Sequence, residues 1–221
     1  MPGYSNGMSS QFFRHVRAWV FDLDNTLYDP GINLFAQIET LMTDYIVGRL
    51  GVSPGEATAL RRRYWAEHGT TLAGLMAHHR VDADDFLDTV HRIDLSALAP
   101  DPALRRAISA LPGRRIVYTN GSRAHAHAVL AARGLTGQFD AVYGLEDADY
   151  HPKPREEAFA RVFGRDGLQA AQAAMFEDDA RNLAVPHRLG MRTVLVAPEA
   201  EDADHIHHHT PDLPGFLSQV V

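Results

Sequence analysis

The chain has 221 residues, of which 45% are hydrophobic and 22% are charged, and its formal net charge is −7. This apolar content and modest charge exclude a chain that is mainly disordered. The acidic balance argues against binding to a nucleic-acid polymer, because such proteins usually present a basic face. The sequence contains no cysteine, which excludes disulfides, iron–sulfur clusters, thiolate zinc sites and a thiol nucleophile.

Two features bear on location. No apolar run approaches the roughly 18 residues that a membrane helix needs, so we expect no membrane partner. Residues 1–11 (MPGYSNGMSSQ) have neither the basic start nor the apolar stretch of a signal peptide, and we interpret them as a loose, polar N-terminal extension. We therefore expect a cytoplasmic protein.

Four short apolar runs that end in polar residues predict strands buried on both faces. In chain order they are VRAWVFD (16–22), RRIVYTN (114–120), QAAMFED (172–178) and MRTVLV (191–196). Helical patterns lie between them; Ser122 and Gly134, for example, fit the start and end of a helix. This alternation predicts an α/β fold with a doubly wound, parallel, Rossmann-like sheet and an active site outside the carboxyl ends of the strands.

Residues 31–112 lack this strand–helix rhythm and predict an all-helical cap inserted after the first strand. Within them, Ser53, Pro54 and Glu56 fit a capping box with proline in the first turn. The predicted core then comprises residues 12–30 and 113–221.

Carboxylates follow two of the predicted strands. Asp22 and Asp24 stand on either side of Leu23, and residues 177–179 read Glu-Asp-Asp. Clustered carboxylates repel one another, and a hard cation relieves the repulsion. The alternatives are an ordinary turn at the first pair and an acid-rich helix start at the second group.

Two further segments could hold an anion. Thr119, Asn120 and Gly121 lie between a predicted strand and a helix start, where backbone N–H groups and a hydroxyl favour an anion. Lys153 stands between two prolines, which restrict the backbone and can aim its ammonium group. Each segment alone also fits a plain capped turn or a solvated lysine.

Taken together and in this order, the four segments resemble the motifs of the haloacid dehalogenase-like hydrolase superfamily. The resemblance implies that Asp22 is a nucleophile that forms an aspartyl-phosphate and that Asp24 is the general acid and base. It implies that Thr119 and Lys153, helped by the N–H groups around Asn120 and Gly121, hold the phosphoryl group.

The same resemblance implies a Mg²⁺ cofactor bound by Asp22, the backbone carbonyl of Asp24, and Asp178. The sequence departs from the usual Gly-Asp-Ser/Asp form at Glu177, and the later acid is replaced by Asn182. We therefore expect Asp179 to act on the metal only through a water or another residue.

A narrower resemblance, to the pyrimidine 5′-nucleotidase branch, is carried by DLDNTLY (22–28), HGTTLAGLM (68–76) and the segment MFED-x-ARNL. It implies a pyrimidine nucleoside 5′-monophosphate as substrate and places Thr70 and Thr71 against it. The alternative is that Gly69, Thr70 and Thr71 form a junction that caps the next helix. Sugar phosphates and phosphoglycolate stay open as substrates.

Other functions compete with this one. A dehalogenase would share the nucleophile but needs neither a metal nor a second acid. A phosphomutase would need cap cations for a second phosphate, for which Arg61–Arg63 and His78–Arg80 are candidates. A receiver-like module lacks an 80-residue helical insert. The oligomeric state stays open, and so does metal binding by His205–His209, which we interpret as part of a solvated loop before a C-terminal Leu-Pro-Gly turn.

Overall fold

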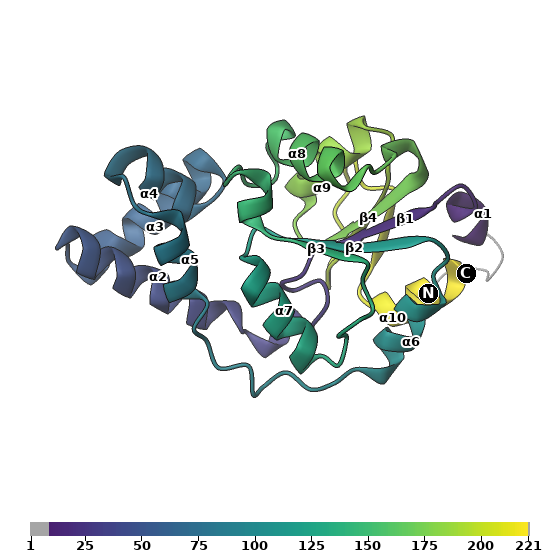
Figure 1. The fold of residues 1–221 in the computed structure, drawn as a ribbon, viewed down its shortest axis with the longest axis horizontal. Helices are drawn as coiled ribbons and strands as arrows, with labels where there is room; N and C mark the ends of the chain where they lie inside the picture. The colour runs from purple at the N-terminus through teal and green to yellow at the C-terminus, as the bar shows by residue number, and fades with distance from the viewer. Residues whose placement is uncertain (1–8, 221) are drawn as a thin grey trace.

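The computed structural model describes residues 9–220 as an α/β core with a group of helices at one end (Figure 1). Six strands form one parallel sheet in the order β3-β2-β1-β4-β5-β6. They are β1 (Ala18–Phe21), β2 (Arg114–Tyr118), β3 (Ala141–Tyr143), β4 (Ala173–Glu177), β5 (Arg192–Val196) and β6 (His208–Thr210). The expected α/β fold, with a parallel sheet and a helical cap after its first strand, is confirmed.

The central strand β1 contributes side chains to the apolar clusters on both faces of the sheet, because successive side chains of a strand point to opposite sides. Trp19 and Phe21 enter the apolar cluster on one face, and Ala18 and Val20 enter the cluster on the other. The helices of the first face are α1 (Ser9–Phe13), α6 (Pro102–Ala110), α7 (Arg123–Ala132) and α10 (Leu213–Val220). Those of the second are α8 (Glu156–Asp166) and α9 (Ala180–Arg188), on the opposite side of the sheet in Figure 1.

The two edge strands were not predicted from the sequence. Each has only three residues: the apolar run of β3, Ala-Val-Tyr, is too short to be distinguished from a loop, and β6 is the polar run His-His-Thr. Two expectations about this end of the chain were therefore wrong: His208 and His209 belong to β6, and the expected Leu-Pro-Gly turn opens α10. Proline is tolerated in the first turn of a helix because its missing N–H would have no helical partner there.

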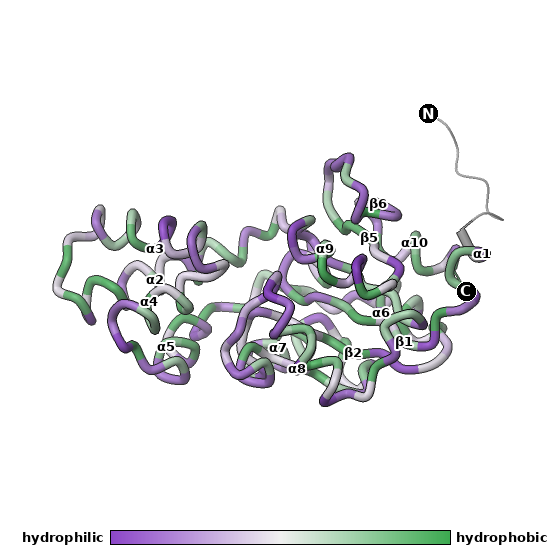
Figure 2. The backbone as a smooth tube through the Cα atoms, turned by 90° about the horizontal axis from the view of Figure 1, so that it is seen from above, coloured by the Kyte–Doolittle hydropathy of each residue, from purple (hydrophilic) through white to green (hydrophobic). Residues whose placement is uncertain are grey.

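The cap consists of four helices packed around their own apolar cluster. They are α2 (Phe35–Leu50), α3 (Pro54–His68), α4 (Thr71–His79) and α5 (Ala83–Val90). The capping box expected at Ser53 is present, and Gly51 ends α2 with φ of 67°. In Figure 2 these helices form the end of the molecule away from the sheet.

Gly74 allows α3 and α4 to pack closely. A Cβ atom at this position would lie 2.3 Å from Cγ of Tyr64, which is too close for two carbon atoms. Tyr64 is buried in the cap cluster, so it has little room to move aside. Glycine at position 74 therefore sets the contact between the two helices that carry much of the cavity wall described below.

Helix α6 packs on the sheet although it lies inside the range expected for the cap. Its Leu104 and Ile108 belong to the same apolar cluster as Trp19 and Phe21. We therefore propose that the cap comprises α2–α5 and that the chain returns to the core between residues 91 and 102.

The structure describes only part of the expected N-terminal extension, residues 1–11. Residues 1–8 lie outside the described residues, and 9–11 belong to α1, which ends at the buried Phe13. Within residues 9–220, the helices are all too short or too polar to cross a membrane.

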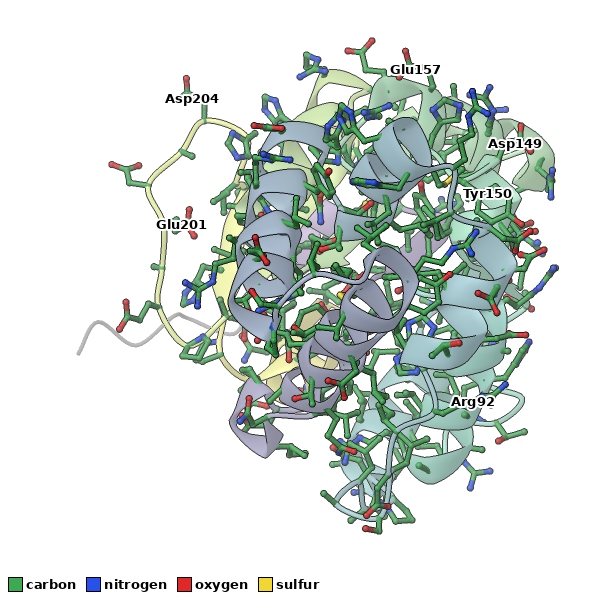
Figure 3. The ribbon with its side chains drawn as sticks, turned by 90° about the vertical axis from the view of Figure 1, so that its left-hand side faces the viewer. Arg92, Asp149, Tyr150, Glu157, Glu201 and Asp204 are labelled. Atoms are coloured by element: carbon green, nitrogen blue, oxygen red, sulfur yellow. The ribbon has the colours of Figure 1, made fainter. Side chains whose placement is uncertain are left out.

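Core and cap are joined by direct contacts as well as by the chain. Tyr150 Oη donates to Asp84 Oδ1 at 2.6 Å, and Leu145 of the core is buried in the apolar cluster of the cap. Figure 3, viewed from the cap end, shows Asp149 and Tyr150 together at one edge, and the loop that carries Glu201 and Asp204 at the opposite edge. The segment 145–155 thus contacts the cap and also carries Lys153.

Candidate active site

The predicted site residues meet at the carboxyl ends of the three central strands. Asp22 directly follows β1, and its N–H donates to the Phe176 carbonyl of β4 at 2.9 Å. Thr119 directly follows β2, and its N–H donates to the Tyr143 carbonyl of β3 at 3.1 Å. Strand pairing therefore fixes the backbone beneath the site.

Lys153 brings these strand ends together. Its ammonium group is 1% exposed and donates to Asp22 Oδ1 at 2.7 Å, to Glu177 Oε2 at 2.6 Å and to the Tyr118 carbonyl at 3.1 Å. Burial alone would lower the pKa of Lys153, but the Asp22 and Glu177 carboxylates raise it above its ordinary value. The lysine is therefore a fixed positive charge.

Asn120 aims this lysine. The Lys153 N–H donates to Asn120 Oδ1 at 2.8 Å, and Asn120 Nδ2 donates back to the Lys153 carbonyl at 3.2 Å. The side chain of Asn120 is thus committed to the lysine backbone. At the same turn, the Gly121 N–H donates to Thr119 Oγ1 at 2.9 Å.

Three carboxylates form a candidate metal group. One oxygen of Asp22, of Glu177 and of Asp178 can be chosen so that all three lie within 4.8 Å of one another. Burial, followed by the charge of Asp22, raises the pKa of Asp178 to about 7 and that of Glu177 well above its ordinary value. Burial also raises the pKa of Asp22, against the opposing effect of Lys153. The group is therefore short of positive charge.

This donor set fits Mg²⁺. It consists of oxygen ligands only, which magnesium prefers. Three carboxylates and one ammonium carry a formal charge of −2, and one divalent cation brings the sum to zero. Asn25 Nδ2 donates to Asp178 Oδ2 at 3.3 Å and orients that carboxylate.

Glu177 is a site residue whose role was not predicted from the sequence. It is the last residue of β4, is 1% exposed, and pairs with Lys153. Asn182 Nδ2 donates to Glu177 Oε1 at 3.1 Å, so the asparagine that replaces an expected acid holds this carboxylate. A charged residue at the end of an otherwise apolar strand was the available signal.

Asp24 is held separately from the metal group. Its Oδ1 accepts from Tyr28 Oη at 2.8 Å and pairs with His125 Nε2 at 2.9 Å. Burial raises the pKa of Asp24, but the charge and hydrogen bond of His125, with the Tyr28 hydroxyl, lower it below its ordinary value overall. His125 stacks on His91 at 4.4 Å between ring centroids. Neither histidine was predicted from the sequence to belong to the site.

Asp179 has another partner. Its carboxylate caps α9 through the Arg181 N–H and pairs with the Arg181 guanidinium. The Arg181 Cζ atom lies 4.0 Å from the centroid of the Trp65 ring on α3. Asp179 is thus connected to the cap through Arg181.

A cavity of about 440 Å³ lies between core and cap, and Asp22, Asp24, Lys153 and Asp178 line it. Thr70 and Thr71 also line it, but both hydroxyls have local partners. Thr70 Oγ1 accepts from the Ala73 N–H at the start of α4, and Thr71 Oγ1 donates to the Arg61 carbonyl at 3.2 Å.

The histidines of segment 205–209 do not converge. His207 Nδ1 accepts from the Thr193 N–H, His209 Nε2 bonds the Ala197 carbonyl, and His208 packs against Phe13 and Phe216. Within residues 9–220, the group of Asp22, Glu177 and Asp178 is the one that has metal-binding spacing.

Comparison with known proteins agrees with this geometry. A model of the haloacid dehalogenase-like hydrolases matches residues 16–190, which include Asp22, Thr119, Lys153 and Asp178. The chain belongs to the haloacid dehalogenase-like hydrolases. The expectation of a hydrolase of this superfamily is thereby confirmed.

Individual relatives are more distant. A protein of Dickeya dadantii (strain 3937) named "Probable phosphatase IndB" is 28% identical over 213 residues, covering 91% of this chain and 90% of that protein. "Phosphate metabolism protein 8" of Saccharomyces cerevisiae is 24% identical over 197 residues; these cover 81% of this chain but 61% of the yeast protein. YfnB of Bacillus subtilis, solved bound to magnesium, has a TM-score of 0.59 at 16% identity, with 93% of this chain and 98% of YfnB covered. At that identity the likeness concerns the fold.

Proposed function

We propose that this haloacid dehalogenase-like hydrolase is a Mg²⁺-dependent phosphomonoesterase that acts through an aspartyl-phosphate on Asp22. The observation that carries the proposal is the group of three carboxylates, Asp22, Glu177 and Asp178, within 4.8 Å of one another. Such crowding in a buried site favours a bound cation.

In this proposal Asp22 is the nucleophile. Lys153 and Thr26 each hold one of its two carboxylate oxygens, at 2.7 and 3.1 Å, and so fix its orientation. Its attack on phosphorus forms the aspartyl-phosphate bond and breaks the bond to the leaving oxygen. Lys153 offsets charge on the phosphoryl oxygens. Mg²⁺, held by Asp22 and Asp178 with Glu177 nearby and the Asp24 carbonyl as a further ligand, would supply the remaining positive charge when bound.

In this proposal Asp24 is the general acid and base. Both of its hydrogen bonds fall on Oδ1, and Oδ2 accepts none from residues 9–220. The charge of a bound phosphate dianion would raise the pKa of Asp24 by repulsion, so that Oδ2 can take up a proton. Oδ2 can then give this proton to the leaving oxygen and later take one from the water that cleaves the aspartyl-phosphate, steps worth about 10²–10⁴ in rate. Tyr28 and His125 hold the carboxylate in place.

For the substrate we propose a small phosphorylated molecule, with a pyrimidine nucleoside 5′-monophosphate preferred over a sugar phosphate or phosphoglycolate. The cavity of about 440 Å³ lies within the range of about 300–1,000 Å³ typical of small-molecule sites. The cap lines one side of this cavity, where the leaving group would lie.

Hydrolysis of p-nitrophenyl phosphate tests the reaction class. We expect turnover with Mg²⁺, none in EDTA, and none on a 2-haloacid. The variant Asp22→Asn should lose at least 99% of kcat, because the nucleophile is removed at constant size. Dehalogenation without metal, or full phosphatase activity in EDTA, would contradict the proposal.

A further inference from the structure

The wall that the cap contributes to the cavity is mostly apolar and contains one ion pair. Phe35 and Trp65 on this wall are 40% and 50% exposed. Among them, Arg61 Nη1 of α3 donates to Glu39 Oε1 of α2 at 2.5 Å, and both residues line the cavity. The aromatic rings suit a flat ligand, and the ion pair adds a polar edge.

Arg61 has more donors than its neighbours use. A guanidinium group carries five N–H donors. Its side chain is 12% exposed, and Glu39 is the only acceptor that residues 9–220 provide for it; Nε is buried without a partner. Unmatched buried donors are costly, so an acceptor brought by a ligand would be favoured here.

Glu39 supplies the complementary function. Its side chain is 44% exposed, and only Oε1 is engaged by Arg61. Oε2 is therefore available to accept from a ligand N–H. The pair presents a donor next to an acceptor, and its two charges cancel. A neutral group with an acceptor beside a donor matches this pair better than a second phosphate does.

The backbone of Arg61 is also held in place. Thr71 Oγ1 donates to its carbonyl at 3.2 Å, and Gly74 allows α4 to pack closely against α3. Thr71 is thus a positioning residue for Arg61. Arg62, the neighbouring cation on this wall, is exposed to solvent and has no ion-pair partner in the described part of the chain.

We propose that Arg61 and Glu39 read the edge of a neutral, planar leaving group that carries a hydrogen-bond acceptor next to a donor, as the base of a nucleotide does. The exposed ring of Phe35, and the face of the Trp65 ring that Arg181 leaves open, would pack against the faces of that group. This inference rests on the proposed phosphatase function, because the ring belongs to the leaving group of the phosphomonoester.

A pair of substrates isolates the ring. Uridine 5′-monophosphate and ribose 5-phosphate share the phosphate and the pentose, and only the first carries a base. We expect the wild-type enzyme with Mg²⁺ to have a kcat/KM at least tenfold higher for the nucleotide. The ratio of the two kcat/KM values then measures recognition of the base.

Three variants test the pair. Arg61→Lys keeps the positive charge but loses the planar fork of donors. Glu39→Gln keeps an acceptor oxygen but removes the charge. Each should lower the ratio by about tenfold, the effect of losing roughly 1.4 kcal/mol of hydrogen bonding in a buried site. Arg63→Met, an exposed position outside the cavity on the same helix, is the control and should leave the ratio unchanged.

The outcomes are separable. Equal kcat/KM for the two wild-type substrates, or an unchanged ratio in both Arg61→Lys and Glu39→Gln, would overturn this inference and leave the phosphatase proposal standing. A base-dependent loss in Arg62→Met alone would assign the contact to the solvated cation instead. No hydrolysis of any phosphomonoester would overturn the phosphatase function itself. Melting temperatures of all variants identify any that fail to fold.

Discussion

At the scale of single residues, the chemistry depends on charges that the fold forces together. Asp22 and Glu177 are buried beside the half-buried Asp178, and within residues 9–220 Lys153 is the ammonium group that pairs with Asp22 and Glu177. Leaving such a group short of positive charge destabilises the folded chain, because buried carboxylates repel. The residue arrangement therefore links stability to the binding of a cation.

The variant Asp178→Asn tests this link. Without a metal it should melt at a temperature equal to or above that of the wild type, since one repelling charge is gone. Saturating Mg²⁺ should raise the wild-type melting temperature by several degrees and that of the variant much less, because only binding to the folded state stabilises. If Mg²⁺ raises the melting temperatures of the wild type and of Asp178→Asn by the same amount, Asp178 is not a ligand. Asp179→Asn, whose carboxylate is paired with Arg181, is the matched comparison.

At the scale of elements, the cap contacts the core through α3 and α9. The guanidinium of Arg181 packs on the Trp65 ring, and the same arginine pairs with Asp179, next to the metal group. Trp65 and Arg181 line the same cavity as Asp22. The contact is therefore placed to couple cap position to the metal-binding loop.

Replacing Trp65 by leucine removes this contact. A cation–π pair at a partly exposed site is worth about 0.5–1 kcal/mol, so we expect kcat/KM for phosphomonoesters to fall about two- to fivefold. Trp65→Phe keeps a ring and should lose less. Steady-state kinetics on p-nitrophenyl phosphate measure the effect; an unchanged kcat/KM in Trp65→Leu would show that the contact does not contribute.

Strand β6 predicts an acid sensitivity. Burial, followed by the charge of Arg192, lowers the pKa of His208 to about 4 from an ordinary value near 6.5. Because the folded chain holds His208 neutral, its free energy of unfolding is highest above pH 6.5 and falls as the pH drops toward 4. The loss is at most about 1.4 kcal/mol per pH unit, and it is smaller here because the side chain is partly exposed. His208→Gln should flatten this part of the stability profile in urea unfolding, whereas the exposed His127→Gln should not.

At the scale of the whole molecule, the sequence predicted the strands that are buried on both faces, because burial requires a run of apolar residues. The strands β1, β2, β4 and β5 are short apolar runs, and for this reason the acids that follow β1 and β4 were expected at the edge of the sheet where they lie. Each edge strand has only three residues: the apolar run of β3 is too short to stand out in the sequence, and β6 is polar. Helix α6 was assigned to the cap from the sequence because an amphipathic pattern does not show whether the helix packs on the sheet or on other helices.

Site residues could be predicted where the residue type and its motif indicate the chemistry. They could not be predicted where a role depends on which distant segments the fold brings together. Asp22 and Lys153 were singled out because the four motifs occur together and in order, whereas each motif alone also fits a plain turn or a solvated lysine. The pairing of Glu177 with Lys153, and of His125 with Asp24, joins segments 24 and 101 residues apart and depends on the packing of the loops. The Arg61–Glu39 pair likewise requires α2 and α3 to be placed side by side.

The central claim is that Asp22 carries the phosphoryl group during turnover, and trapping that group tests it most directly. The variant Asp24→Asn lacks the base for the second step, while p-nitrophenol leaves without help from an acid, so the aspartyl-phosphate should accumulate. Acid quench followed by peptide mass spectrometry should find one phosphoryl group on Asp22, and none in the double variant with Asp22→Asn. A phosphoryl group on another residue, or wild-type turnover with no phosphorylated Asp22 in either enzyme, would contradict the account.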